Sequence, residues 1–131
     1  VIAGSFAAHG LEGRFEELYR DLPPKLVAGK PVPAAQKYLN DFRTGADYQF
    51  WHALGILLVA SLLRDRNSRW LEWSARLMTI GIVLFSGLLY LLTLLAMPKF
   101  GMIAPIGGTA MILGWLCLAI GLCPCRKTAA E

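Results

Sequence analysis

Two long runs without a charged residue or a histidine constrain this chain more than any other feature. From Leu77 to Pro98, and again from Phe100 to Cys125, there is no Asp, Glu, Lys, Arg or His, and only Lys99 separates the two runs. About 20 helical residues cross the ~30 Å hydrocarbon core of a bilayer, so uncharged runs of this length predict membrane spans. A third apolar run, residues 48–63, carries only His52. Small soluble proteins do not need helices that are apolar on every face, so the sequence predicts an all-α integral membrane protein.

The runs divide the chain into three full spans of a small antiparallel helical bundle. We expect transmembrane helices at 45–63, 71–97 and 102–122, and we expect residues 1–9 to form the end of an earlier first span. The connections between consecutive full spans are short, which makes these spans antiparallel neighbours.

Positively charged residues predict the orientation of the bundle. The connection 64–69 has three Arg and the tail 123–131 has Arg126 and Lys127, whereas the opposite side has only Lys99 in its short turn. Lys and Arg in short loops stay on the cytoplasmic side, so we expect this connection and the C-terminus to be cytoplasmic. The expected location is the bacterial inner membrane, with the mitochondrial inner membrane as the alternative, and the lipid bilayer is the first expected partner.

An extracytoplasmic segment, residues 10–44, precedes these spans. Residues 10–47 hold six basic and six acidic side chains, so the net charge of +4 comes from residues that flank the membrane. In this segment Glu12–Leu22 predicts an amphipathic helix that Pro23 and Pro24 stop. Its expected apolar side consists of Phe15, Leu18, Tyr19 and Leu22. Lys25–Pro33 predicts an irregular loop, and Ala34–Phe42 a second short helix that leads into the membrane.

Several function classes find no support in the sequence. No basic stripe with interleaved aromatic residues indicates nucleic-acid binding. Cys117 lies inside the last span, where we expect it to pack as a small residue, and Cys123 and Cys125 lack the further ligands of a metal site. No nucleophile–base pair or phosphate-binding loop can be assembled. We therefore expect no enzyme activity, no metal and no cofactor.

Small and polar residues mark the faces on which the spans should meet, because helices in a bilayer associate through close packing and interhelical hydrogen bonds. The last span has a seam of small residues at spacings of three and four: Gly107, Ala110, Gly114, Cys117 and Gly121. The middle span has a polar stripe that should point inward: Thr79, Ser86, Tyr90 and Thr93. The span at 45–63 has Tyr48, His52 and Gly55 on one face. Counting ~1.5 Å per helical residue places His52, Tyr90 and Pro105–Gly108 at one depth, so we expect them to meet inside the bundle.

Four motifs in a fixed order carry a resemblance to a known family. They are Ala8-His9-Gly10-Leu11, Thr44-Gly45-x-x-Tyr48-Gln49-x-x-His52-Ala53-Leu54, Leu84-Phe85-Ser86-Gly87-x-x-Tyr90, and Ala104-Pro105-Ile106-Gly107-Gly108 followed by Gly114-Trp115. In this order and spacing the chain resembles the small inner-membrane proteins of the YgdD/YwdK type, a family of unknown function with mitochondrial relatives of the transmembrane protein 256 type. The resemblance implies a four-helix membrane protein whose first span ends at the Ala-His-Gly motif, and it implies no reaction, cofactor or substrate. The chain departs from the pattern in its long 12–42 insertion and its Cys-Pro-Cys tail.

Two functions remain open at this point. The first is a structural or accessory subunit that packs against a larger membrane complex, or that self-associates, through its small-residue seams, with segment 10–44 ordering against a partner. The second is a membrane-embedded binder of a quinone, a lipid or a haem at a polar cluster that consists of His9, Tyr48, Gln49, His52 and Tyr90.

The ligand-binding hypothesis depends mainly on two histidines. An ionisable residue within a span marks a functional site by default, and axial histidines on two spans, here His9 and His52, suit a haem. The simpler alternative is that His52 donates a hydrogen bond to a carbonyl or to Tyr90 and holds the helices together. Trp115 is expected to contribute packing.

Overall fold

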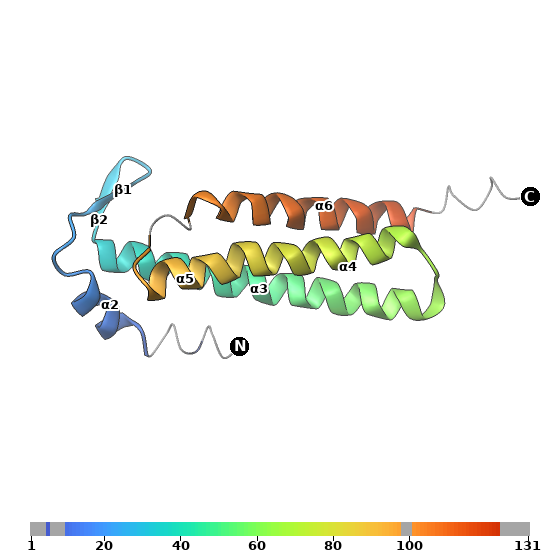
Figure 1. Ribbon diagram of the computed structural model, residues 1–131, viewed down its shortest axis with the longest axis horizontal. Helices are drawn as coiled ribbons and strands as arrows, with labels where there is room; N and C mark the ends of the chain where they lie inside the picture. Colours follow the sequence, from blue (N-terminus) through green and yellow to red (C-terminus); the bar gives the residue numbers. More distant parts are fainter. Residues whose placement is uncertain (1–4, 6–9, 98–100, 124–131) are drawn as a thin grey trace, which may run out of the picture.

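Three long helices lie side by side in the computed structural model, which describes residue 5, residues 10–97 and residues 101–123. They are α3 (Ala34–Asp65), a rod built from three consecutive segments, and α6 (Ala104–Leu122) (Figure 1). The rod consists of α4 (Arg69–Ile82), the π-helical turn η1 (Val83–Gly87) and α5 (Leu88–Leu94). All three are long and apolar enough to cross a membrane, which confirms the predicted all-α membrane fold. The expected end of a first span, apart from residue 5, and the tail beyond Cys123 lie outside the described residues.

Helix α3 is longer than the sequence analysis predicted. The short helix at 34–42 and the span at 45–63 are one continuous helix of 32 residues. At ~1.5 Å per residue such a helix measures ~48 Å, so about twelve of its residues extend beyond a ~30 Å hydrocarbon core. Its first turns carry Lys37, Asp41, Arg43 and Asp47, whose charges are costly inside a bilayer. These turns are therefore the part of α3 that stands outside the membrane.

Residues 10–33, which we call the N-terminal cap, fold at the end of the bundle where α5 ends (Figure 1). The cap contains α2 (Glu12–Leu18), β1 (Lys25–Val27) and β2 (Lys30–Val32). A hydrophobic core joins the cap to the first turns of α3 and to α5; its buried members are Leu11, Phe15, Tyr19, Ala34, Tyr38, Leu39, Phe42 and Leu92. Spacing by four places the first three of these on one side of α2. The cap is thus ordered against the chain's own helices.

Two predictions about the cap were wrong. The expected irregular loop is an antiparallel hairpin in which Val27 pairs with Lys30, and Ala28 and Gly29 turn the chain with φ of 49° and 78°. Positive φ at both central residues is typical of the tight turns that match strand twist. The expected apolar side of α2 is also different, because the helix ends at Leu18 and leaves Leu18 and Leu22 exposed. The buried stripe extends toward Leu11 instead.

The glycine seam of α6 packs against the rod. A Cβ built on Gly107 would lie 2.5 Å from the backbone nitrogen of Phe85, and one on Gly114 would lie 2.8 Å from Cγ of Met78. From the rod, a Cβ on Gly81 would lie 2.5 Å from Cγ of Met111. The glycines of the predicted seam are therefore a helix contact within this chain, whereas Cys117 of the same seam is half-buried.

The polar stripe of the rod is interrupted at η1. Ser86 and Thr93 are buried as predicted, whereas Thr79 is exposed and its hydroxyl donates to the carbonyl of Ala75 over 2.8 Å. The buried positions follow helical spacing up to Gly81 and resume at Ser86, five residues later. A π-helical turn has i→i+5 spacing, so η1 shifts the buried face and Thr79 does not lie above Ser86. The prediction for Thr79 was wrong for this reason.

Candidate functional site

His52 lies buried on α3, and both of its ring nitrogens have partners, one on α3 and one on α6. Its Nδ1 lies 2.8 Å from the carbonyl oxygen of Tyr48, and the indole Nε1 of Trp115 lies 3.1 Å from its Nε2. A carbonyl only accepts and an indole N–H only donates, so the arrangement fits a neutral imidazole with its proton on Nδ1. Gly55 makes room for this pair, because a Cβ there would lie 3.3 Å from Cζ2 of Trp115. The imidazole therefore links two spans.

Tyr90 forms a second polar contact closer to the cap. Its hydroxyl donates to Oε1 of Gln49 over 2.7 Å, and its ring lies 4.7 Å from the ring of Phe42, centroid to centroid. The ring occupies space left by Gly45, where a Cβ would lie 3.2 Å from Cε1 of Tyr90. This contact fastens α5 to α3.

The structure does not join His52, Tyr90 and Pro105–Gly108 into one cluster as the depth count predicted. That count placed Gly45 and Gly101 at the same level. The structure instead puts Gly45 beside Tyr90 and Ser86, and Gly101 beside Leu92. Gly45 is thus further along the rod from the cap than Gly101, which places His52 at the level of Trp115 on α6.

The remaining predicted site residues take different positions. The ring of Tyr48 lies between those of His52 and Phe85, at centroid distances of 5.9 Å and 4.8 Å. Gly107 and Gly108 approach Phe85 and not His52. His9, the second histidine of the haem hypothesis, lies outside the described residues.

Sequence reasoning missed Trp115 as a polar contact and assigned it to packing. A signal for its role was available, because an indole N–H in the middle of a span cannot find an acceptor in lipid and needs one on a neighbouring helix. The seven-residue repeat of Gly107, Gly114 and Gly121 marks the neighbouring face of the same helix.

Tyr19 fastens the cap to the rod. Its hydroxyl donates to the carbonyl oxygen of Thr93 over 2.6 Å, and its ring stacks on Tyr38 with centroids 4.2 Å apart. Burial raises the pKa of the Tyr19 phenol to about 12, and Tyr38 and Asp41 add to the effect. The phenol is therefore held in its neutral, donating form.

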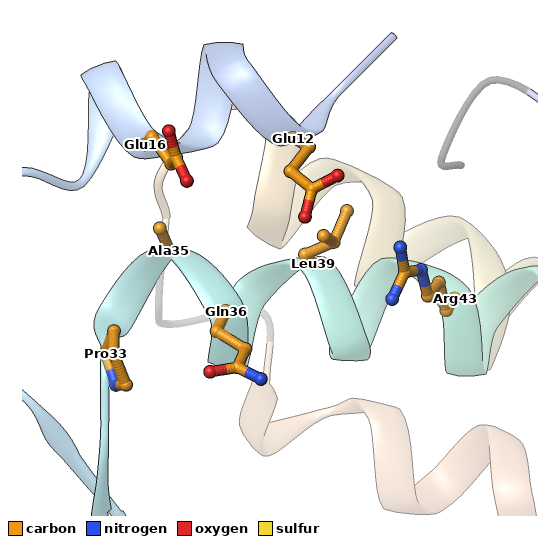
Figure 2. A pocket seen from close by; sticks show the side chains of 7 residues that line it. All are labelled: Glu12, Glu16, Pro33, Ala35, Gln36, Leu39 and Arg43. Atoms are coloured by element: carbon orange, nitrogen blue, oxygen red, sulfur yellow. The ribbon is translucent and has the colours of Figure 1, made fainter. Parts of the chain in front are cut away.

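A cleft of about 340 Å³ lies between α2 and the first turns of α3 (Figure 2). Glu12 and Glu16 extend from α2 toward α3, while Gln36 and Arg43 border the cleft from α3. Leu39 lies between the two sides (Figure 2). The cleft thus has two exposed carboxylates on the α2 side and one guanidinium on the α3 side.

The described side chains offer few ligands to a metal ion or a haem iron. Within the residues that the structure describes, no group of three or more His, Cys, Asp or Glu side chains is arranged to hold a metal ion. Nε2 of His52, a common metal-binding atom, accepts the indole N–H of Trp115. Axial ligation of iron through that nitrogen would require this hydrogen bond to break.

Comparison with known proteins gives a consistent family assignment. Residues 3–108 match the family described as "Protein of unknown function (DUF423)". A UPF0382 membrane protein of Staphylococcus epidermidis is 38% identical over 120 residues, which cover 92% of this chain and 82% of the relative. The UPF0382 membrane protein YwdK of Bacillus subtilis is 36% identical over 119 residues, covering 89% and 80%.

A third relative is the UPF0382 inner membrane protein YgdD of Escherichia coli, which is 38% identical over 79 residues, or 60% of each chain. No solved structure matches the chain. The resemblance to the YgdD/YwdK type is confirmed, and this chain belongs to the DUF423 family of membrane proteins.

Proposed function

We propose that this chain is a non-catalytic accessory protein of the bacterial inner membrane, which packs against a larger membrane complex or against a second copy of itself. The observation that carries the proposal is the exposed apolar surface of the cap. Its exposed apolar side chains are Leu18, Leu22, Leu26 and Val27, and Leu26 is 78% exposed. Because the cap sits on the part of α3 that stands outside the hydrocarbon core, lipid tails do not cover these side chains. Protein contact would cover them.

The polar contacts between helices support a structural role. His52, Trp115, Tyr90 and Gln49 bond to one another or to backbone and hold α3, α5 and α6 together. The glycine seam is also occupied by a contact within the chain, so the seam is no longer the surface through which we expect a partner to dock. We propose instead that a partner docks on the cap, which packs against the chain's own helices.

The proposed orientation places the connection between α3 and α4, and the end of α6, in the cytoplasm. These two lie at the same end of the bundle, away from the cap (Figure 1). That end carries Arg64, Arg66 and Arg69, as the distribution of positive charge requires for a cytoplasmic side. The Escherichia coli relative YgdD is named as an inner membrane protein, which supports the choice of membrane.

The test is native mass spectrometry of the full chain extracted from its own membranes in mild detergent. We expect a stoichiometric complex with another membrane protein or with a second copy, and we expect Leu26→Gln to weaken it. Lys30→Gln, in the paired strand of the same hairpin, is the matched control. A wild-type chain that emerges alone, or a complex that Leu26→Gln leaves unchanged, would contradict the proposal.

The same sample tests the ligand-binding alternative. A lone chain that carries a small molecule, and that loses it in a folded His52→Ala variant, would replace the accessory role with binding of a quinone, lipid or haem. The contacts of His52 count against this outcome, because both ring nitrogens already have protein partners.

A further inference from the structure

A second groove, of about 420 Å³, lies between α4 and α6 at the end of the bundle opposite the cap. Its lining consists of Arg69, Trp70, Trp73, Leu77 and Cys117. Neither the polar contacts of His52 nor the cleft beneath α2 shares a residue with it. We propose that this groove binds one anionic phospholipid, independently of the accessory role proposed above.

The lining changes from charged to apolar along the groove. Arg69 is the first residue of α4, Trp73 follows one turn later and Leu77 one further turn along the same face. At ~1.5 Å per residue, Arg69 and Leu77 are separated by ~12 Å along the helix axis. A phospholipid has the same order of groups, with a phosphate at the surface, glycerol esters below it and acyl chains deepest. The two tryptophans stand at the level of the esters, where indole rings are favoured in membrane proteins.

Charge complementarity selects an anionic occupant. Around this end of the bundle stand Arg64, Arg66, Arg69 and Arg76, against the carboxylates of Asp65 and Glu72. Arg76 already has partners, because its guanidinium lies 3.9 Å from Glu72 and 5.5 Å from the ring centroid of Trp73. Arg69 forms no ion pair with any residue in the described part of the chain, and its side chain is exposed at the mouth of the groove. A phosphate would provide the anion that this guanidinium lacks.

The part of the groove further from Arg69 suits an acyl chain better than a helix of another protein. Leu77 and Cys117 provide an apolar floor of low bulk, and Gly114 and Gly121 hold α6 against α4 on either side of it. A packed helix would cover the floor but would place apolar surface or backbone against Arg69. Basic pockets between transmembrane helices near the cytoplasmic surface are typical lipid headgroup sites.

The test uses the full chain, delipidated in mild detergent and titrated in native mass spectrometry with dioleoyl phosphatidylglycerol and, separately, dioleoyl phosphatidylcholine. The acyl chains are identical, so the comparison isolates the headgroup charge. We expect one phosphatidylglycerol to bind at least about fivefold more tightly than phosphatidylcholine, since a basic group near the membrane surface attracts an anionic lipid to about this extent. Arg69→Ala should remove the preference. Arg64→Ala, which deletes the same charge at an exposed position outside the groove, should keep it.

A second variant keeps the test decisive if Arg69→Ala unfolds. Cys117→Phe fills the floor and leaves every charge in place, and we expect it to lower the occupancy of both lipids. Equal binding of the two lipids by the wild type, equal effects of Arg64→Ala and Arg69→Ala, or a second copy of the chain lost in Arg69→Ala would each overturn the proposal.

Discussion

Two adjacent glycines of α6 offer a sharp test of how the helices pack. A Cβ on Gly107 would lie 2.5 Å from the backbone nitrogen of Phe85 and 2.9 Å from the carbonyl carbon of Leu84. A Cβ on Gly108 would come no closer than 3.8 Å, to the ring of Phe85, which is ordinary contact. Both substitutions by alanine gain up to about 1 kcal/mol of helix propensity, so the difference between them isolates the contact with the rod.

The expected difference can be worked from these distances. At Gly107 the obstacle is backbone, which cannot rotate away, so α6 and the rod must separate by about 1 Å, and overpacking of this kind costs about 1–3 kcal/mol. We expect Gly107→Ala to be about 2 kcal/mol less stable than Gly108→Ala, close to a thirtyfold change in the unfolding equilibrium. The measurement is equilibrium unfolding of the purified variants in mixed micelles of increasing dodecyl sulfate content, followed by tryptophan fluorescence. Equal stabilities of the two variants would refute the packing argument.

Three further predictions concern the polar contacts. Tyr19→Phe removes the hydrogen bond to the Thr93 carbonyl and should destabilise the cap by about 1–2 kcal/mol, detected as faster proteolysis within the cap; an unchanged digestion rate would contradict it. The phenol ionises near pH 10 when unfolded but near 12 when folded, so its contribution is complete below pH 10. Between pH 10 and 12 the wild type should lose about 2 kcal/mol more than Tyr19→Phe, and parallel pH profiles would count against the burial of this phenol. A double-mutant cycle of His52→Ala and Trp115→Phe should give a coupling of about 0.6–1.7 kcal/mol, whereas strict additivity would exclude the hydrogen bond.

The spans were predictable because lipid leaves a strong signal in the sequence. A charged group inside hydrocarbon is costly, so the absence of charge from Leu77 to Pro98 and after Phe100 was sufficient to locate two helices. The glycines at 107, 114 and 121 also indicated a close helix contact correctly. The sequence did not reveal the partner of that contact, because small residues permit close approach equally well within a chain and between chains.

The cap and the polar contacts were less predictable because they depend on tertiary packing. From sequence alone, Tyr38 and Phe42 belong to a separate short helix. In the structure Phe15 and Tyr19 share a hydrophobic core with them, and this packing stabilises the part of α3 that extends beyond the membrane. The partner of His52 depended on the relative height of α3 and α6. The depth count was wrong by one or two helical turns, so it placed His52 beside Gly108, whereas the structure places it beside Trp115.

The π-helical turn η1 changes the direction in which the side chains of the rod point on either side of it. An α-helix advances ~100° per residue, so the extra residue in one turn changes the angular phase of everything that follows. Before the turn, Gly81 packs against Met111 of α6, and Met78 contacts both Gly114 of α6 and Gly55 of α3; after it, Leu92 joins the core that α5 shares with α3 and the cap. A side-chain substitution can loosen either contact, but only an insertion or a deletion between Gly81 and Ser86 would change the phase between them. The length of this stretch is therefore under a constraint that its apolar composition does not express.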